Sequence, residues 1–382
     1  MTLRLLLSCG EPSGDLYAGA LTRELRRLDP AVSVSGLGGP QLEASGGRLI
    51  DDYRGLAVTG LTEAIGKLPR SYAVMRRLVA AARAERPDAL VLIDFPDFNF
   101  RLGSRVKALG IPVVYYISPQ LWAWRRGRMK TMTRIADRVL VIFPFEEQLY
   151  RDAGVAVEFV GHPLIDLATP SATRSEFLAA RGLSPSAPTV AILPGSRPNE
   201  VARILPDLLA SASLIRQSVP GTQFVLARAP HLNDALFATT SVPGVSGTEV
   251  TIVENDTDTV LASADVALTA SGTATVQTAL HDTPMVIVYR TSPMTYRLAR
   301  RLVRVDAIGM VNLIAGEKIV PELVQDEFTP AAVAREAISM LTDRARAAST
   351  RQGLARVRET LGGPGASRRA AEAILNVARG RS

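Results

Sequence analysis

Short runs of Val, Ile and Leu recur along the chain, and longer segments with helical spacing of apolar residues separate them. Polar residues do not alternate within the runs, which is typical of parallel strands covered by helices on both faces. The pattern predicts strands at residues 3–8, 32–35, 89–93, 113–117, 139–142 and 158–160, and again at 190–193, 224–227, 251–253, 266–268 and 285–288. It therefore predicts an α/β fold with two parallel sheets.

A polar stretch at residues 169–188 separates the two sets of strands, and we place a linker there because it carries two Pro-Ser or Ser-Pro breaks. The predicted domains are residues 1–168 and 186–345, both Rossmann-like and doubly wound. Ligands of such sheets bind beyond the carboxyl ends of the strands, so we expect the two domains to face each other across a cleft. Residues 346–382 are predicted to be helical and to pack either on the first domain or on a partner subunit of a homodimer.

Composition narrows the class of protein. The 44 Lys and Arg against 37 Asp and Glu give a net charge of +7, which favours an anionic partner. An aromatic content of 5% and the lack of an RNA-binding or zinc-finger signature argue against nucleic acid. Cys9 is the single cysteine, which excludes an internal disulfide, and the three histidines are scattered, so we expect no metal site and a reducing cytoplasm. No apolar run approaches the roughly 20 residues of a spanning helix, so any membrane contact is expected to be peripheral.

Two segments in the second half of the chain join a predicted strand, a Gly-containing turn and a helix. They read Ala-Ile-Leu-Pro-Gly-Ser-Arg at 191–197 and Thr-Ala-Ser-Gly-Thr-Ala at 269–274. Such turns aim backbone N–H groups and a helix N-terminus at a phosphate. Arg197 precedes a helix expected to begin near Glu200, where a cation is unfavourable unless an anion lies beside it. We therefore predict that Arg197, Ser271 and Thr273 hold a nucleotide diphosphate.

The turns of the first half are less specific. Gly-Glu-Pro-Ser-Gly-Asp at 10–15 follows the first strand and is expected to open a helix near Asp15, and Gly-Leu-Gly-Gly-Pro occupies 36–40. Neither has the Gly-x-Gly-x-x-Gly spacing of a dinucleotide fingerprint, so a nicotinamide dehydrogenase is disfavoured. Either segment could also be a tight turn without a ligand.

Two carboxylates and an amide follow the predicted strand at 89–93, in the order Asp94, Asp97 and Asn99. Pro96 fixes the backbone between the carboxylates. A carboxylate at this edge of the sheet suits a general base towards an acceptor hydroxyl. The alternative for Asp97 is that it caps a helix beginning near Phe98.

Three further motifs each have two interpretations. Trp122 and Trp124 beside Arg125 suit a sugar face, a phosphate or an acyl chain, although part of the pair could be packing. His162 either faces the cleft or is a hydrogen-bonded structural histidine. The Asp-Thr-Asp at 256–258 resembles a metal motif, yet it reads more simply as a helix cap with acidic first-turn residues, so we expect no metal there.

Taken together and in order, these motifs identify the chain as a member of a known family. The matching segments are 10–15, 93–99, 118–119 with 122–125, 144–146, 161–162, 193–197 with 200–201, 271–274 and 312–316. The chain resembles the lipid-A-disaccharide synthases, which are glycosyltransferases with the two-domain GT-B architecture.

The resemblance implies transfer of 2,3-diacylglucosamine from its UDP conjugate to 2,3-diacylglucosamine 1-phosphate, giving a β-1,6-linked disaccharide and UDP, with inversion and with no metal or other cofactor. It implies work at the cytoplasmic face of the inner membrane of a Gram-negative bacterium. It also implies site residues. Asp94 is the base; the UDP-sugar side comprises Gly195, Ser196, Arg197, Glu200, Ser271, Gly272, Thr273, Gln277 and Asn312; and the acceptor side or cleft comprises Glu11, Ser13, Asp97, Asn99, Ser118, Trp122, Trp124, Arg125 and His162.

The chain departs from the family's pattern at Gln277, where many relatives carry a carboxylate; the amide can hydrogen-bond a ribose but has no charge. Residues 61–79 combine apolar and basic side chains, which suits an anionic bilayer surface, although Pro69 interrupts this helix and packing against the sheet is the alternative. The competing functions are another UDP-sugar enzyme of this architecture, such as an epimerase or a transferase with a soluble acceptor, and a non-enzymatic nucleotide-sugar sensor.

Overall fold

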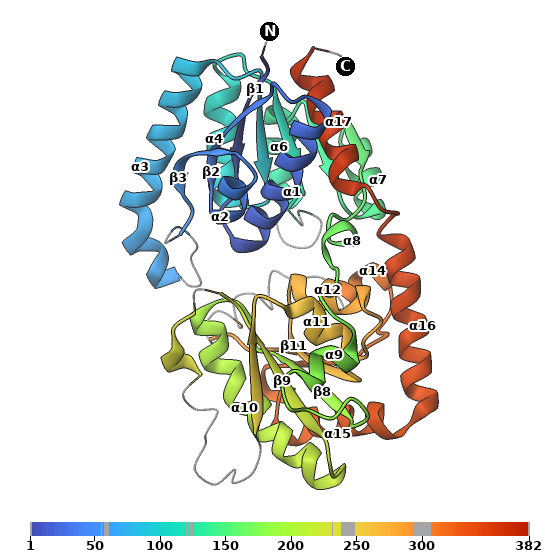
Figure 1. The fold of residues 1–382 in the computed structure, drawn as a ribbon. Helices are drawn as coiled ribbons and strands as arrows, with labels where there is room; N and C mark the ends of the chain where they lie inside the picture. Colours follow the sequence, from blue (N-terminus) through green and yellow to red (C-terminus); the bar gives the residue numbers. More distant parts are fainter. Residues whose placement is uncertain are drawn as a thin grey trace. The chain divides into compact units, whose positions relative to one another are not determined.

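The computed structural model describes residues 2–54, 56, 61–119, 121, 126–230, 232–237, 249–292, 296 and 307–380. The chain forms two compact units (Figure 1). Unit 1 comprises Met1–Leu167 and Leu361–Ser382, and unit 2 comprises Ala168–Thr360.

Unit 1 is built on a parallel sheet in the order β3-β2-β1-β4-β5-β6-β7. The strands are β1 (Arg4–Ser8), β2 (Ser33–Gly38), β3 (Arg48–Asp52), β4 (Ala89–Ile93), β5 (Val113–Tyr116), β6 (Arg138–Val141) and β7 (Val157–Phe159). Its helices are α1 (Pro12–Leu28), α2 (Pro40–Ala44), α3 (Leu61–Glu85), α4 (Pro96–Lys107), α6 (Met129–Ile135), α7 (Pro144–Asp152), α8 (Leu164–Leu167) and α17 (Ala366–Ala378).

Unit 2 repeats this plan with the order β10-β9-β8-β11-β12-β13. The strands are β8 (Thr189–Leu193), β9 (Gln223–Arg228), β10 (Val250–Glu254), β11 (Val266–Ala270), β12 (Met285–Tyr289) and β13 (Glu322–Val324). The helices are α9 (Arg174–Ala179), α10 (Pro198–Ser218), α11 (Thr257–Ala262), α12 (Thr273–Leu280), α14 (Met310–Ala315), α15 (Pro330–Thr342) and α16 (Arg344–Thr360). Both sheets have the doubly wound strand order of Rossmann-like folds.

Every predicted strand is present, and the structure adds β3 and β13 at the edges of the two sheets. Edge strands have one neighbour and less helix cover, so they need no continuous apolar run. The five residues of β3 read Arg-Leu-Ile-Asp-Asp, and β13 is only three residues long. The apolar-run criterion therefore overlooked them.

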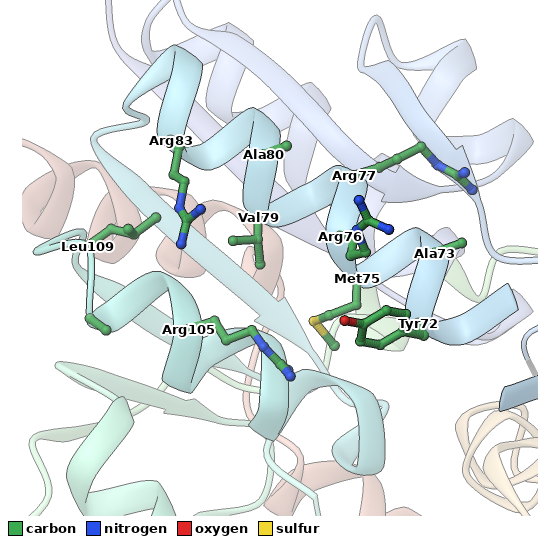
Figure 2. Close-up of a pocket in the computed structure, with 11 residues that line it drawn as sticks. Tyr72, Ala73, Met75, Arg76, Arg77, Val79, Ala80, Arg83, Arg105 and Leu109 are labelled. Carbon is green, nitrogen blue, oxygen red and sulfur yellow. The ribbon is translucent and has the colours of Figure 1, made fainter. Parts of the chain in front are cut away.

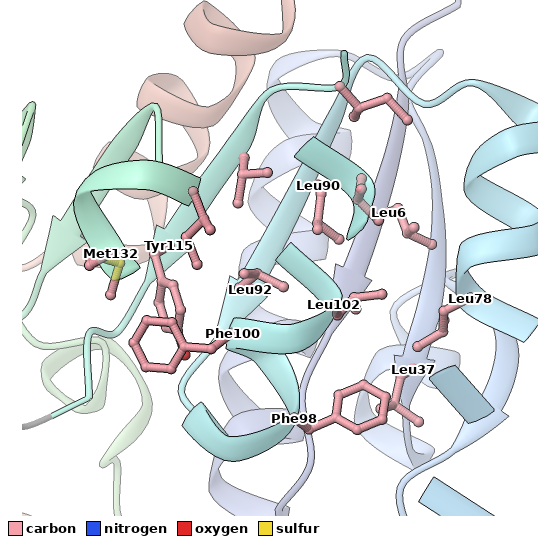
Figure 3. Close-up of a cluster of buried hydrophobic side chains, with 14 of the residues drawn as sticks. Leu6, Leu37, Leu78, Leu90, Leu92, Phe98, Phe100, Leu102, Tyr115 and Met132 are labelled. Atoms are coloured by element: carbon pink, nitrogen blue, oxygen red, sulfur yellow. The ribbon is translucent and has the colours of Figure 1, made fainter. Parts of the chain in front are cut away.

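A cluster of buried hydrophobic side chains in unit 1 lies between the sheet and helices α3, α4 and α6 (Figure 3). Leu6 of β1 and Leu90 and Leu92 of β4 meet Leu78 of α3 and Leu102 of α4, all with 2% or less of their surface exposed. Burying one such side chain stabilises the fold by about 1.5–3 kcal/mol. This packing fixes β1 and β4 side by side at the centre of the sheet.

Residues 169–188 carry ordered structure and belong to unit 2. Thr173 and Glu176 form a capping box at the start of α9. Arg174 donates hydrogen bonds to the carbonyl oxygens of Pro185, Ala187 and Ser263. The chain passes from unit 1 to unit 2 after Leu167, ahead of the residues expected to form a linker.

The end of the chain returns to unit 1, where α17 packs against α1. Asp166 accepts hydrogen bonds from the N–H groups of Gly365 and Ser367 at the start of α17, at 2.6 and 3.2 Å. Arg369 donates from Nε to the carbonyl oxygen of Val160 at 2.9 Å. These contacts fasten α17 to the segment that follows β7.

Candidate active site

In unit 2 the two turns singled out in the sequence lie next to each other. Strands β8 and β11 are hydrogen-bonded neighbours, with Leu193 opposite Thr269. The order of the strands reverses between them, which is where doubly wound sheets bind ligands. The turn at 194–197 and the turn at 271–272 therefore share this edge of the sheet.

The start of α12 offers hydrogen-bond donors. The N–H of Ser271 donates to the carbonyl oxygen of Val288 at 2.9 Å, and its hydroxyl donates to that of Ile308 at 3.2 Å. The first-turn N–H groups of Thr273 and Ala274 have no acceptor among the backbone hydrogen bonds of the described residues. A Cβ built on Gly272 would meet no atom within 4 Å, so the space over this turn is open. An anion fits there.

The start of α10 is arranged differently. The helix begins at Pro198, with Arg197 as its N-cap residue, earlier than the expected start near Glu200. Oε2 of Glu200 accepts a hydrogen bond from the N–H of Ser196 at 3.1 Å. A Cβ on Gly195, whose φ is 115°, would lie 2.2 Å from that oxygen. Glu200 thus supplies an anion at this helix start, which leaves the α12 end as the better place for a phosphate.

Arg197, Glu200 and Tyr289 lie close together at the same edge. The pKa of Tyr289 is raised chiefly by burial and then by the charge of Glu200, while Arg197 acts in the opposite direction. The charge of Arg197, which follows β8, therefore acts on Tyr289 at the end of β12.

Asn312 is buried and its amide group is fully used. Its Nδ2 donates to the carbonyl oxygen of Val320 and to Oε1 of Glu322, and its Oδ1 accepts from the N–H groups of Ile319 and Val320. Glu322 in turn accepts from the N–H groups of Ile308 and Gly309. Asn312 therefore supports the loops beside the α12 turn. No pattern in the sequence marks its partner Glu322.

Gln277 lies one turn into α12 and is tied to Asp258 of α11. Its Nε2 donates to Oδ1 of Asp258 at 2.8 Å, and Nε2 of His281 lies 2.8 Å from the same oxygen. Asp256 is the N-cap residue of α11 and Asp258 lies in its first turn, as expected. The carboxylate of Asp256 makes no capping hydrogen bond to the backbone and accepts from the hydroxyls of Ser171 and Thr259. Asp256 and Asp258 thus serve packing of α11.

In unit 1 the turns after β1 and β4 adjoin in the same way, since Ser8 pairs with Leu92. Helix α1 begins at Pro12, with Glu11 as N-cap residue and Ser13 in its first turn, rather than near Asp15. The buried carboxylate of Asp15 accepts three backbone hydrogen bonds at the start of α2, from Gly39, Gln41 and Leu42 at 2.7–3.1 Å. The role of Asp15 is therefore to join α1 to α2.

Asp94 stands at the end of β4 in a left-handed backbone conformation, with φ of 43°. Phe95 has φ of 49° and Ile117, at the end of neighbouring β5, has φ of 58°. Each such residue costs of order 1–3 kcal/mol and persists only where the surroundings hold it. Residues with a strained backbone are found preferentially at functional sites. Asp94 is also partly exposed, so solvent or a ligand can reach it.

Two tyrosine hydroxyls lie near Asp94. The pKa of Tyr115 is raised well above its ordinary value, first by burial and then by the charge of Asp94. The pKa of Tyr17 is raised by burial, with Tyr116 and Asp94 adding to it. Both tyrosines remain protonated neighbours of the carboxylate.

Among the other predicted site residues of unit 1, Asp97 lies on the surface. Its side chain is 71% exposed and forms an ion pair with Arg128. The cap interpretation is wrong, because α4 begins at Pro96 and its N-cap residue is Phe95. Ser118 is buried and hydrogen-bonded to the hydroxyl of Tyr150. Trp122, Trp124 and Arg125 lie outside the described residues.

His162 is a structural histidine. Its Nδ1 accepts a hydrogen bond from the N–H of Leu164 at 3.2 Å, and its ring packs against Tyr17 and Phe143. Burial lowers its pKa to about 3, so the ring is neutral at physiological pH. The interpretation as a packed, hydrogen-bonded residue is confirmed.

A groove of about 820 Å³ lies on unit 1 between α3 and the end of α4 (Figure 2). Apolar side chains including Met75, Val79 and Leu109 line it, and Arg83 and Arg105 reach into it from the two helices. Tyr72 is 60% exposed at one end. Within the described residues, no helix is both long and apolar enough to cross a bilayer.

The fold places the chain in the GT-B class of two-domain α/β proteins. UDP-N-acetylglucosamine 2-epimerase from Neisseria meningitidis has a TM-score of 0.67 at 13% identity, covering 98% of this chain and 100% of that one. The glycotransferase of kitacinnamycin has a TM-score of 0.65 at 17% identity, covering 99% of both chains.

The sequence gives a closer relationship. A family model described as lipid-A-disaccharide synthetase matches residues 5–377. Lipid-A-disaccharide synthase from Geobacter metallireducens is 46% identical over 377 residues, covering 98% of this chain and 97% of the relative. The Myxococcus xanthus enzyme is 42% identical over 374 residues, with the same coverage. The chain belongs to the lipid-A-disaccharide synthase family, and it is a glycosyltransferase.

Proposed function

We propose that the chain transfers 2,3-diacylglucosamine from its UDP conjugate to 2,3-diacylglucosamine 1-phosphate, forming a β-1,6-linked disaccharide 1-phosphate and releasing UDP. The observation that carries the proposal is membership of the family along residues 5–377. The arrangement of both units supports it, because each brings its candidate residues to the switch point of its sheet.

In this proposal unit 2 binds the UDP moiety. The N–H groups of Thr273 and Ala274 and the guanidinium of Arg197 receive the diphosphate. Negative charge grows on the diphosphate as its bond to the sugar carbon breaks, so donors already held in place there favour the transition state. Gly195 lets Glu200 approach Ser196 and so shapes the turn that carries Arg197.

Unit 1 supplies the base and receives the acceptor. The 6-hydroxyl of the acceptor attacks C1 of the donor sugar as the bond from C1 to the phosphate oxygen breaks, and the proton passes to the carboxylate of Asp94. A single displacement inverts C1, which converts an α-linked donor into a β-linked product. The position of Asp94 after a central strand, partly exposed and held in a strained conformation, supports this role.

Incubation with both acylated glucosamine substrates, followed by chromatography, tests the proposal. We expect a disaccharide 1-phosphate and one UDP for each molecule formed. Conversion of UDP-N-acetylglucosamine into an epimer, with no disaccharide formed, would instead establish an epimerase. Binding of UDP with no turnover in the presence of any acceptor would establish a sensor.

We further propose that unit 1 touches the cytoplasmic face of the inner membrane through α3. Leu68 and Tyr72 are 54% and 60% exposed there, and Tyr72 lines the groove that also contains Arg83 and Arg105. Apolar side chains next to arginines suit an anionic bilayer surface. The double variant Leu68→Ser/Tyr72→Ser should sediment less than the wild type with vesicles that contain phosphatidylglycerol. The control Leu149→Ser, which alters an exposed leucine of α7, should sediment as the wild type does. Equal sedimentation of the two variants would exclude α3 as the membrane contact.

A further inference from the structure

Strand β4 ends in two consecutive left-handed residues, Asp94 and Phe95, and neither is glycine. The N–H of Asp94 donates to the carbonyl oxygens of Tyr116 and Ile117 at 3.3 and 3.2 Å, so the bend is tied to the end of β5, where Ile117 is also left-handed. L-residues avoid this conformation, and β-branched ones avoid it most strongly. Other contacts must therefore hold the turn in place.

Asn99 supplies one of them. It is fully buried in the first half of α4, and its Nδ2 lies 2.8 Å from the carbonyl oxygen of Asp94 and 3.2 Å from those of Ile93 and Ser8. Three carbonyl oxygens around one atom fix that atom as the amide nitrogen. Its Oδ1 accepts from the hydroxyl of Ser8 at 2.7 Å. The donors of the amide group are thus used within the protein, and the side chain is fully buried.

Tyr115 supplies the other. Its hydroxyl donates to the same carbonyl oxygen of Asp94 at 2.8 Å, and the side chain is fully buried between β5 and α4. Phe100 of α4 packs against its ring at 5.7 Å between centroids (Figure 3). A single carbonyl oxygen at the end of a central strand thus receives two buried donors, one from α4 and one from β5.

The other side of the bend is closed by Phe95. A Cβ on Gly10 would lie 2.2–2.5 Å from the Phe95 ring, which brings the turn after β1 into direct contact with the bend. The Phe95 ring also stacks on Phe98 at 5.4 Å. The backbone at Asp94 and Phe95 is therefore held by contacts from α4, from β5 and from the turn after β1.

We propose that Tyr115 and Asn99 are positioning residues for the transfer reaction: by holding the carbonyl oxygen of Asp94 they maintain the left-handed bend that presents its carboxylate to the acceptor hydroxyl. The proposal rests on Asp94 being the base. Displacement of a reacting group by about 1 Å can cost about 100-fold in rate, so a carboxylate on a strained turn needs such support.

The variant Tyr115→Phe tests the proposal, because it removes one hydroxyl and leaves the buried ring. We expect kcat to fall at least 10-fold while the KM values of both substrates and the dissociation constant of UDP stay within 2-fold. Tyr116→Phe is the matched control. It is the same change one residue along β5, where the side chain faces α17, and kcat should not change.

A double-mutant cycle separates positioning from a structural role. In the Asp94→Asn background the residual kcat should fall less than 2-fold on adding Tyr115→Phe, because a missing carboxylate cannot be misplaced. The same fractional loss in both backgrounds, or an unchanged kcat in Tyr115→Phe alone, would overturn the proposal. Full activity of Asp94→Asn alone would instead remove Asp94 as the base. Ser8→Ala, which removes the hydrogen bond to Oδ1 of Asn99, should repeat the Tyr115→Phe pattern more weakly.

Discussion

Nε2 of Gln277 donates a hydrogen bond to Oδ1 of Asp258 at 2.8 Å, and this bond joins α12 to α11. His281, at the end of α12, reaches the same carboxylate oxygen. Where many relatives are expected to carry an acid in α12, this chain has an amide, and its acid lies on the adjoining helix. An acidic residue at 277 would therefore meet Asp258 rather than open space.

We predict that Gln277→Glu lowers the free energy of unfolding, because the new carboxylate would lie against that of Asp258 and repel it. The loss should be about 1–2 kcal/mol at pH 8, or roughly 2–6 °C in Tm. Thermal denaturation of the wild type and the variant at this pH measures it. Adding Asp258→Asn should restore the Tm, and failure to do so would show that the pair is not the cause.

His162 should make stability depend on pH. Its pKa is lowered by burial from 6.5 to about 3, so between these values the unfolded chain binds a proton that the folded chain does not. Stability is therefore lost as the pH falls below 6.5, by about 2 kcal/mol between pH 7 and pH 5. Urea unfolding measures the free energy of unfolding at each pH, and this free energy should fall less with decreasing pH in His162→Gln than in the wild type. The same pH dependence in both proteins would mean that His162 takes up its proton without unfolding.

Gly195→Ala should lower the free energy of unfolding by more than the unfavourable backbone conformation of alanine would by itself. The new Cβ would lie 2.2 Å from Oε2 of Glu200, which would have to leave the N–H of Ser196. We expect a loss of roughly 1–3 kcal/mol together with weaker UDP binding, measured by denaturation and by calorimetry. The control is Gly221→Ala, which also has a positive φ but meets nothing within 4 Å. It should lose less stability and should bind UDP normally.

Asp94→Asn and Arg197→Ala should differ in their effect on UDP binding. The first keeps the size of the side chain, so UDP binding should remain while kcat falls by a factor of 100 to 10,000, the usual contribution of a general base. The second removes a charge from the diphosphate site, so both UDP binding and turnover should weaken. Titration with UDP and steady-state kinetics distinguish them. Loss of UDP binding in Asp94→Asn would assign Asp94 to the donor side instead.

Much of this architecture follows from local patterns. Buried parallel strands need continuous apolar runs, which is why all the central strands were predictable, while the edge strands β3 and β13 were not. The turns at Gly10, Asp94, Gly195 and Ser271 directly follow strands, so the sequence also indicated that they meet at the carboxyl edges of the sheets.

Helix starts were less predictable. Pro12, Pro96 and Pro198 each open a helix that was expected to begin two or three residues later. Proline is favoured in the first turn because its missing N–H would have no partner there, so the proline itself was the better signal.

By itself the sequence determined the number of sheets, the segments that form their central strands, the family and the turns that bear the candidate chemistry, because each of these depends on residues that are neighbours in the chain. Only the tertiary structure decided what Asp15, Asn99, Asn312 and His162 do. Their roles depend on partners brought close by folding, as Ser8 and Asn99 are across 91 residues. A buried polar group must find a hydrogen-bond partner, and which partner it finds is settled only when the strands and helices are packed.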